Sequence, residues 1–368
     1  MKIAILGTRG IPNFYGGFEQ FAENFALFLY EKGHDIYVYN SSSHPYKKKL
    51  FNGVHIIHQF DPEKHIGTAG QFIYDLNCIL DTRKKKFDII LQLGYTSSSI
   101  WYPLHPKKSI VITNMDGLEW KRSKYSKLVQ KGLKFAERFA VNNSNYLISD
   151  SLGIQNYLMQ KYQVNSEYIA YGASTFYADN AAVLNDYNVE INNFNMIMAR
   201  FEPENNFEIV LDGYVQSLTE MPILVIGNYN NKYGNYLKKK YSKINKIRFL
   251  GSIYNLNTLN YLRFYSNIYF HGHSVGGTNP SLLEAMASGA LVAAHNNEFN
   301  RGVLELNAYY FSNMADVINI ISTVKKRENL QIIENNYSTI ESTFNWNKIN
   351  EHYLQFFEQC LERNPYTK

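Results

Sequence analysis

The segment from His271 to Gly302 most constrains how this chain can fold. Residues 268–271 just upstream are apolar and rich in strand-forming types, and residues 281–288 favour a helix. Residues 291–294 return to an apolar strand pattern. The segment therefore predicts a buried strand, a loop, a helix and a second strand, which is the repeating unit of an α/β protein with a parallel sheet.

The loop before this helix has features of an anion-binding site. Gly276 and Gly277 allow the backbone to approach a ligand closely. Asn279 and Pro280 predict the start of the helix, because asparagine caps the first turn and proline fits the first helical position. Unpaired N–H groups and the helix dipole then favour a phosphate. An ordinary strand–loop–helix unit without a ligand is the alternative.

Residues 283–289, Leu-Glu-Ala-Met-Ala-Ser-Gly, followed by an apolar strand, resemble the donor-site signature of the family 4 retaining glycosyltransferases. The resemblance covers nearly the whole chain. It implies the GT-B fold, an α/β architecture of two doubly wound Rossmann-like domains that face each other across a cleft. It also implies that Glu284 binds the ribose of a nucleotide sugar, so we expect Glu284→Ala to weaken donor binding with the fold intact. The family has another glutamate eight residues earlier, where this chain has Gly276.

Composition predicts a globular protein of two domains without a membrane-spanning helix. The 368 residues are 45% hydrophobic and 15% aromatic, which is enough to bury two cores. No apolar run reaches about 18 residues, and the N-terminus begins with a strand-like segment, so we expect neither a transmembrane helix nor a signal peptide. Cys78 and Cys360 are isolated, which suits a reducing cytoplasm and predicts no disulfide.

Charge is distributed unevenly between the two halves. Residues 1–172 contain 21 Lys and Arg against 14 Asp and Glu, a net charge of +7, whereas the remainder contains 16 against 18, a net charge of −2. Between residues 121 and 138 the positive side chains alternate with aromatic ones. This pattern suits an anionic membrane surface or a lipid diphosphate, although a solvated helix face fits equally well. No nucleic-acid-binding motif accompanies the charge, and we expect a cytoplasmic protein held peripherally on the inner face of the cell membrane.

The N-terminal strand and helix are joined by a long glycine-containing loop. Its glycines do not form the compact G-x-G-x-x-G pattern of a dinucleotide fold, which argues against an NAD enzyme. Residues 15–19, Tyr-Gly-Gly-Phe-Glu, resemble the N-terminal glycine loop of the same family. The resemblance implies that Gly16 and Gly17 lie against the phosphate or the acceptor. Glu19 either orients a sugar or caps the following helix.

Residues 116–122, Asp-Gly-Leu-Glu-Trp-Lys-Arg, follow a predicted strand. Together with this form of the glycine loop they resemble a narrower group, the rhamnosyltransferase-like enzymes that build bacterial surface polysaccharides. We therefore assign catalytic roles to Asp116 and Glu119, and to Arg200 in the second domain. Turn and helix-start chemistry is the alternative for the two carboxylates.

The predicted domains are residues 1–175, which bind the acceptor, and residues 190–344, which bind the nucleotide sugar, with an aperiodic linker between them. The family resemblance implies that a final helix within residues 345–368 packs back on the first domain, whereas its spacing alone predicts a helix with an apolar face. Arg200 matches the family's pyrophosphate-binding arginine, but Asn205 stands where the family has a lysine. One positive charge is therefore missing.

The remaining donor-site residues are predicted from their places after strands. Gly227 is expected to line the base and phosphate site, and Thr278 lies between the loop glycines and the helix cap, within the diphosphate-binding loop. His271 and His273 have the types needed for a metal, yet this spacing is more typical of hydrogen-bonded structural histidines, and no Asp-x-Asp pair accompanies them. We predict no metal ion.

The family resemblance implies a retaining glycosyltransferase, which we expect to need neither a metal ion nor a cofactor. The likeness to the narrower group implies dTDP-L-rhamnose as the donor and a lipid-diphosphate-linked saccharide of cell-surface polysaccharide synthesis as the acceptor. Three alternatives remain: a transferase with another donor, such as a UDP-hexose or UDP-N-acetylhexosamine; a GT-B nucleotide-sugar epimerase; and a non-catalytic carbohydrate- or lipid-binding protein.

Overall fold

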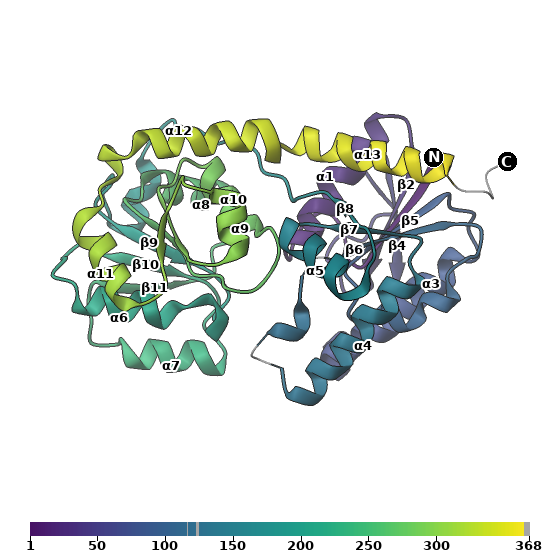
Figure 1. Ribbon diagram of the computed structural model, residues 1–368, viewed down its shortest axis with the longest axis horizontal. Coiled ribbons are helices and arrows are strands. Elements are labelled where there is room, and N and C mark those ends of the chain that lie inside the picture. Colours follow the sequence, from purple (N-terminus) through teal and green to yellow (C-terminus); the bar gives the residue numbers. More distant parts are fainter. Residues whose placement is uncertain (116, 123–124, 364–368) are drawn as a thin grey trace. The chain divides into compact units, whose positions relative to one another are not determined.

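The computed structural model describes residues 1–115, 117–122 and 125–363. Asp116 and Lys124 therefore lie outside the described residues. The chain divides into two compact units (Figure 1). The first contains Met1–Trp120, Tyr125–Ala170 and the C-terminal segment that begins at Trp346, and the second contains Lys121–Lys124 and Tyr171–Asn345. Each unit is built around its own sheet.

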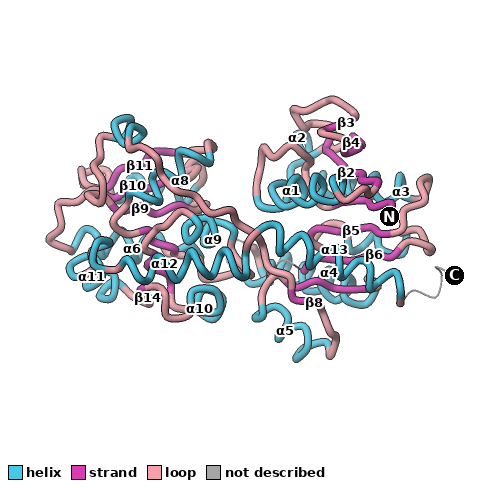
Figure 2. Tube along the Cα trace, turned by 90° about the horizontal axis from the view of Figure 1, so that it is seen from above, coloured by secondary structure: helices cyan, strands magenta, loops and turns pink. Residues whose placement is uncertain are grey.

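The first unit has an eight-stranded sheet in the order β3-β4-β2-β1-β5-β6-β7-β8 (Figure 2). All neighbouring pairs are parallel except β3 and β4, which are antiparallel. The predicted parallel arrangement is confirmed, whereas the short edge strand β3 was not predicted. The strands are β1 (Lys2–Leu6), β2 (Asp35–Ser41), β3 (Leu50–Phe51), β4 (Val54–Gln59), β5 (Ile89–Leu93), β6 (Ile110–Met115), β7 (Tyr146–Ser149) and β8 (Glu167–Tyr168).

Helices pack against both faces of this sheet. Ala4 and Leu6 of β1 form a core cluster with Tyr74 and Ile79 of α3. Because side chains alternate along a strand, Ile3 and Ile5 face the other way and are also fully buried. The helices of this unit are α1 (Gly17–Glu31), α2 (Glu63–Ile66), α3 (Gly70–Thr82), α4 (Lys127–Asn143), α5 (Leu152–Tyr162) and α13 (Trp346–Glu362).

The C-terminal helix α13 packs on α1 through aromatic side chains. The ring centroids of Phe21 and Tyr353 lie 4.8 Å apart, and those of Phe25 and Phe357 lie 5.6 Å apart. The Nδ2 of Asn114, on β6, donates to the hydroxyl of Tyr353 at 2.8 Å. A hydrophobic face at helical spacing thus joins the end of the chain to the first unit.

The second unit has a six-stranded parallel sheet in the order β11-β10-β9-β12-β13-β14 (Figure 2). Its helices are α6 (Phe207–Gln216), α7 (Lys232–Lys240), α8 (Leu256–Tyr265), α9 (Pro280–Ala287), α10 (Glu298–Leu304), α11 (Met314–Thr323) and α12 (Leu330–Thr339). Its strands are β9 (Asn195–Met198), β10 (Ile223–Ile226), β11 (Ile247–Gly251), β12 (Tyr269–His271), β13 (Val292–His295) and β14 (Tyr309–Phe311).

Strand order in the second unit determines where a ligand can bind. The sheet grows from β9 to β10 and β11 on one side, and from β9 to β12, β13 and β14 on the other. The direction of winding therefore reverses between β9 and β12, and in open α/β sheets ligands bind at the carboxyl ends of the strands at such a reversal. The loops that follow β9 and β12 thus frame the candidate site.

Candidate donor-binding site

The loops after β9 and β12 are fastened to each other. The Nδ2 of Asn206 donates to the carbonyl oxygen of Gly272 at 2.8 Å, and the hydroxyl of Ser274 donates to the carbonyl oxygen of Glu204 at 2.8 Å. A Cβ atom added to Gly272 would lie 2.0 Å from the carbonyl oxygen of Asn205, so only glycine allows this approach. The two loops consequently form one surface at the carboxyl edge of the sheet.

Arg200 and Asn205 have different roles in this surface. Arg200 is exposed and lies two residues after the end of β9. Asn205 is 5% exposed, and its Nδ2 donates to the carbonyl oxygen of Arg200 at 2.7 Å. The amide therefore holds the backbone that carries the arginine. A direct contact between Asn205 and a phosphate stays a prediction.

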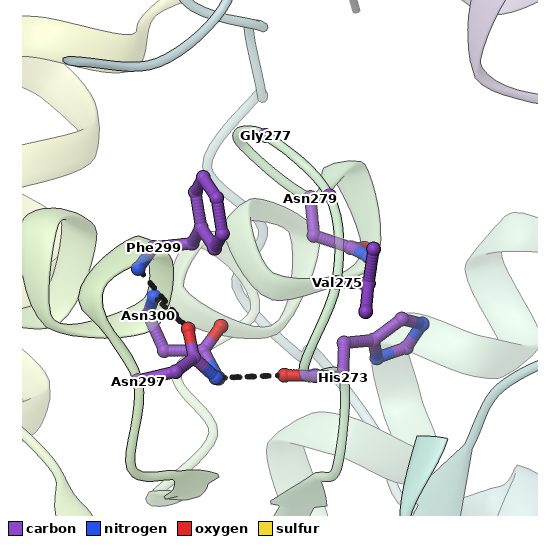
Figure 3. A pocket seen from close by; sticks show the side chains of 8 residues that line it. His273, Val275, Gly277, Asn279, Asn297, Phe299 and Asn300 are labelled. Carbon is purple, nitrogen blue, oxygen red and sulfur yellow. Dashed lines mark hydrogen bonds between the residues drawn. The ribbon is translucent and has the colours of Figure 1, made fainter. Parts of the chain in front are cut away.

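A small depression opens beside the glycine loop (Figure 3). Gly276 has φ of +138°, which favours glycine, and a Cβ atom there would meet only open space. The predicted helix start is confirmed, because Asn279 caps α9 by accepting from the backbone N–H of Ser281 at 3.0 Å. The depression is lined by His273, Val275, Gly276, Gly277, Asn279, Asn297, Phe299 and Asn300.

Two asparagines that sequence analysis missed hold the glycine loop in place (Figure 3). The Nδ2 atoms of Asn297 and Asn300 each donate to the carbonyl oxygen of His273 at 3.0 Å. Asn297 also caps α10 through its Oδ1, and Asn300 donates to the carbonyl oxygen of His295 at 2.8 Å. Asparagine before a predicted helix is a recognisable cap, but the bond across to His273 depends on the tertiary structure.

Glu284 is held by a buried arginine that sequence analysis also missed. The Nη2 of Arg263, on α8, donates to the Oε2 of Glu284 at 2.7 Å. The Arg263 side chain is completely buried, whereas that of Glu284 is 17% exposed. Arg263 in turn donates from Nη1 to the Oδ1 of Asn260 at 3.0 Å. The carboxylate is thereby fixed, and its Oε1 has acceptor capacity for a hydroxyl.

The two histidines after β12 are stacked, with ring centroids 4.3 Å apart and an interplanar angle of 18°. Within the described part of the chain, neither ring nitrogen of His271 nor the Nδ1 of His273 has a hydrogen-bond partner, so the expectation of hydrogen-bonded structural histidines was wrong. Burial lowers the pKa of His271 well below its ordinary value. Burial, together with the charge of Arg200, lowers the pKa of His273 to about 3. Both rings are neutral at pH 7.

Gly227, after β10, has a packing reason for being glycine. Its φ is +147°, and a Cβ atom there would lie 2.2 Å from the carbonyl oxygen of Ala199. The close approach to the end of β9 therefore excludes a side chain, and a contact with the base stays a prediction. Thr278 is buried within the glycine loop. Among the described residues, no group of three or more His, Cys, Asp and Glu side chains is placed to hold a metal ion.

In the first unit, the glycine loop leads into α1. Gly16 is the N-cap residue, and Gly17 begins the helix. Glu19 is 4% exposed, and its Oε1 accepts from the hydroxyl of Thr8 at 3.1 Å and from the backbone N–H of Arg9 at 2.8 Å. Glu19 thus braces the loop that follows β1. Its role in orienting a sugar or in capping α1 stays a prediction.

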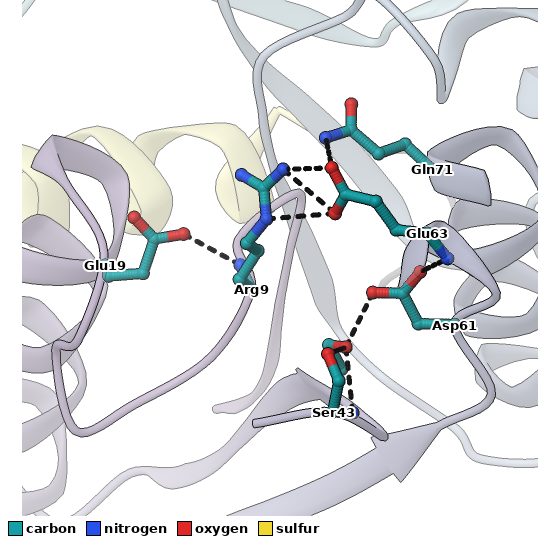
Figure 4. A network of polar contacts seen from close by, with 7 residues as sticks. Arg9, Glu19, Ser43, Asp61, Glu63 and Gln71 are labelled. Atoms are coloured by element: carbon teal, nitrogen blue, oxygen red, sulfur yellow. Dashed lines mark hydrogen bonds and ion pairs between the residues drawn. The ribbon is translucent and has the colours of Figure 1, made fainter. Parts of the chain in front are cut away.

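A polar network continues from this loop (Figure 4). The guanidinium of Arg9 donates three hydrogen bonds to Glu63, from Nη2 to Oε1 at 2.7 Å, from Nη2 to Oε2 at 2.9 Å and from Nε to Oε2 at 3.1 Å. The ring of Tyr15 lies over the same guanidinium at 3.9 Å.

The hydroxyl of Ser97 donates to Asp75 at 2.5 Å, and burial raises the pKa of Asp75 to about 7.

The predicted catalytic segment is partly described. Glu119 is half-buried at the start of a short 3-10 helix, Glu119–Lys121, and Asp116 lies outside the described residues. The Nε1 of Trp120 donates to the Oε2 of Glu137 at 2.9 Å. Glu137 is 1% exposed, and its Oε1 also accepts from Lys161 at 2.9 Å. This buried carboxylate fastens the segment to α4, while the catalytic roles stay predictions.

Solved structures with this fold support the architecture that was predicted. Sucrose-phosphate synthase from Thermosynechococcus elongatus is 15% identical, with a TM-score of 0.81 over 99% of this chain and 100% of that chain. Anabaena Alr3699/HepE in complex with UDP and glucose is 17% identical, with a TM-score of 0.77 over 98% and 100%. A glycosyltransferase from Rickettsia africae ESF-5 is 15% identical, with a TM-score of 0.71 over 99% and 100%. The fold is GT-B, and the predicted fold class is confirmed.

The sequence itself matches one family model. Residues 1–174 match the family described as a domain of unknown function, DUF1972. No curated protein matches the chain. The family match thus covers the first unit except for its C-terminal segment, and the candidate donor-site residues of the second unit lie beyond it.

Proposed function

We propose that this protein is a glycosyltransferase that uses a nucleotide-diphosphate sugar. One observation carries the proposal: the second unit gathers Arg200, the glycine loop with the capped N-terminus of α9, and the fixed carboxylate of Glu284 around its β9–β12 reversal. The first two suit a diphosphate, because a guanidinium binds phosphate bidentately and helix N–H groups favour anions. Glu284 suits a ribose hydroxyl.

The residues suggest how such an enzyme would work without a metal ion. As the glycosidic bond breaks, Arg200 and the N–H groups near Gly276 and Gly277 would stabilise the charge that develops on the leaving nucleoside diphosphate. Transfer proceeds with retention of configuration, needs no enzyme nucleophile, and lets a donor phosphate oxygen take the acceptor's proton. Asp116 and Glu119 are assigned to the catalytic acceptor side.

For the donor we propose dTDP-L-rhamnose. Gly276 removes the carboxylate that the family uses at this position, which suits a 6-deoxy sugar whose hydroxyls differ from those of glucose. A UDP-hexose is the second candidate, since Alr3699/HepE has been solved with UDP-glucose at 16% identity and a TM-score of 0.74. For the acceptor we propose a lipid-diphosphate-linked saccharide of cell-surface polysaccharide synthesis.

We further propose that α4 holds the protein on the anionic inner face of the cell membrane. Lys127, Lys131 and Arg138 are exposed and recur at helical spacing, so they share one face of the helix. Leu128 is 81% exposed and Phe135 is 59% exposed, and they lie two turns apart. Exposed apolar side chains beside basic ones suit an interfacial helix. None of the described helices is both long and apolar enough to span a membrane.

A panel of nucleotide sugars tests the function. The protein is incubated with dTDP-L-rhamnose, UDP-glucose, UDP-galactose and UDP-N-acetylglucosamine, with and without a lipid-diphosphate-linked saccharide and in the presence of EDTA. We expect acceptor-dependent release of nucleoside diphosphate from one donor. Epimerised or free sugar without an acceptor would favour an epimerase, and binding without turnover would favour a non-catalytic protein. Loss of turnover in EDTA would refute metal independence.

A further inference from the structure

The stacked histidines after β12 form a feature that the proposed diphosphate and ribose contacts do not use. His271 is fully buried, and neither of its ring nitrogens has a hydrogen-bond partner among the described residues. The Nδ1 of His273 is buried and likewise unpartnered within that part of the chain. Buried polar atoms are nearly always hydrogen-bonded, so such a group beside a depression points to a ligand.

The structure holds His273 in a defined place. Its carbonyl oxygen accepts from both Asn297 and Asn300 at 3.0 Å (Figure 3). Its ring stacks on that of His271, with the ring centroids 4.3 Å apart. His273 is one of the residues that line the same depression as Gly276 and Gly277. A donor whose diphosphate binds the glycine loop would therefore bring its neighbouring groups to this imidazole.

The chemistry of the ring distinguishes between the groups of a donor. Arg200 and the N-terminus of α9 already supply positive charge for a diphosphate. Burial keeps His273 neutral, with its pKa lowered to about 3, so the ring offers one N–H donor and one lone pair. A phosphate oxygen only accepts, whereas a sugar hydroxyl both donates and accepts. A neutral imidazole is thus matched to a hydroxyl.

We propose that His273 hydrogen-bonds a hydroxyl of the transferred sugar and determines which sugar the donor site accepts. This inference rests on the proposed function. Stacking on His271 holds the ring of His273, and the hydrogen bonds from Asn297 and Asn300 hold its backbone. Because these contacts form before the donor binds, less entropy is lost on binding. His273 is therefore a specificity-determining contact, and His271, Asn297 and Asn300 are its positioning residues.

The test compares His273→Phe with His105→Phe. Phenylalanine keeps an aromatic ring for stacking but removes both nitrogens. His105, in the first unit, is a matched control, because it is also buried and neither of its ring nitrogens has a partner among the described residues. For each protein, calorimetry gives the affinity for UDP, dTDP and their sugar conjugates. Initial rates give kcat/KM for the donor used by the wild type and for analogues that each lack one hydroxyl.

We expect His273→Phe to reduce kcat/KM for the full donor about ten-fold and to leave nucleoside diphosphate affinity within about two-fold. It should also abolish the wild type's discrimination against one deoxy analogue, while His105→Phe keeps it. Undiminished discrimination in His273→Phe, or an equal loss of nucleoside diphosphate affinity, overturns the inference. His273→Gln serves as the second variant if His273→Phe does not fold, with the same two outcomes. A wild type that binds no nucleotide sugar instead refutes the proposed function.

Discussion

Glu284 cannot be removed without affecting Arg263, and this changes what Glu284→Ala should do. Arg263 is completely buried, and Glu284 is the carboxylate to which it donates at 2.7 Å. Breaking a buried ion pair by removing one partner costs about 3–5 kcal/mol, because the remaining charge is left uncompensated. Glu284 is 17% exposed, so solvent partly screens the pair and we take the lower end, about 3 kcal/mol.

Such a loss is readily measured by thermal unfolding. For a unit of this size, 1 kcal/mol shifts the Tm by about 2–4 °C, so Glu284→Ala should lower the Tm of the second unit by roughly 6–12 °C. We therefore expect Glu284→Ala to keep the fold but at lower stability. Glu284→Gln keeps an acceptor for the Nη2 of Arg263 and should lose less. The double variant Arg263→Leu with Glu284→Ala removes both charges and should recover most of the stability.

The double variant also isolates the proposed ribose contact. With stability restored, nucleoside diphosphate affinity should still fall by at least about ten-fold, because a charged hydrogen bond contributes about 1.5–3 kcal/mol. Calorimetry with UDP and dTDP measures this. Wild-type stability in Glu284→Ala would refute the buried ion pair. Wild-type affinity in the double variant would show that Glu284 does not bind the ribose.

Three further predictions concern charge. Arg200→Lys should weaken nucleoside diphosphate binding nearly as much as Arg200→Ala, because a point charge replaces a bidentate fork; two fully active variants would place the pyrophosphate elsewhere. Burial raises the pKa of Asp75 to about 7, so its ionisation opposes folding, and the free energy of unfolding should fall as pH rises from about 4 to 7. Asp75→Asn should remove this decline, as measured by urea unfolding at each pH. An unchanged pH profile in the variant would contradict the prediction. The wild type should sediment with anionic but not neutral liposomes and be released by salt. Charge reversal at Lys127, Lys131 and Arg138 should weaken both sedimentation and turnover of a lipid-linked acceptor. An equal loss of turnover with a short soluble acceptor would place α4 in the active site or core.

Two other lysines of this region are poor choices for that experiment. The Nζ of Lys134 lies 3.9 Å from the centroid of the Trp120 ring, so its reversal would disturb the segment that carries Glu119. Lys124 lies outside the described residues. Charge reversal at Lys127, Lys131 and Arg138 tests membrane binding with less risk to the fold.

Local patterns in the sequence predicted strands β12 and β13 and the start of α9. Buried parallel strands are continuous apolar runs, and Asn279 with Pro280 is a local cap signal, so both can be read without tertiary information. The strands that were missed, β3 (Leu50–Phe51) and β14 (Tyr309–Phe311), are two and three residues long and lie at sheet edges. Such short segments carry too little periodicity to be recognised.

The contacts that hold the candidate site could not be predicted in the same way. Arg263 and Glu284 are 21 residues apart, and Asn300 and His273 are 27 residues apart. Each side chain lies on a different loop or helix, and only the packing of those elements brings the partners together. Residue types alone predicted the candidate ligand-binding side chains, but not the residues that fix those side chains in position.

Asn205 illustrates the same distinction at a position where the chain departs from the family that it resembles. Read from the sequence, asparagine in place of lysine is the loss of a positive charge. In the structure, Asn205 is 5% exposed and donates to the carbonyl oxygen of Arg200, while its own carbonyl lies against Gly272. A lysine at this buried position would have to leave the interior or remain there charged. The asparagine instead fixes the backbone of Arg200, so the diphosphate contact proposed for this arginine would come from a more rigid loop.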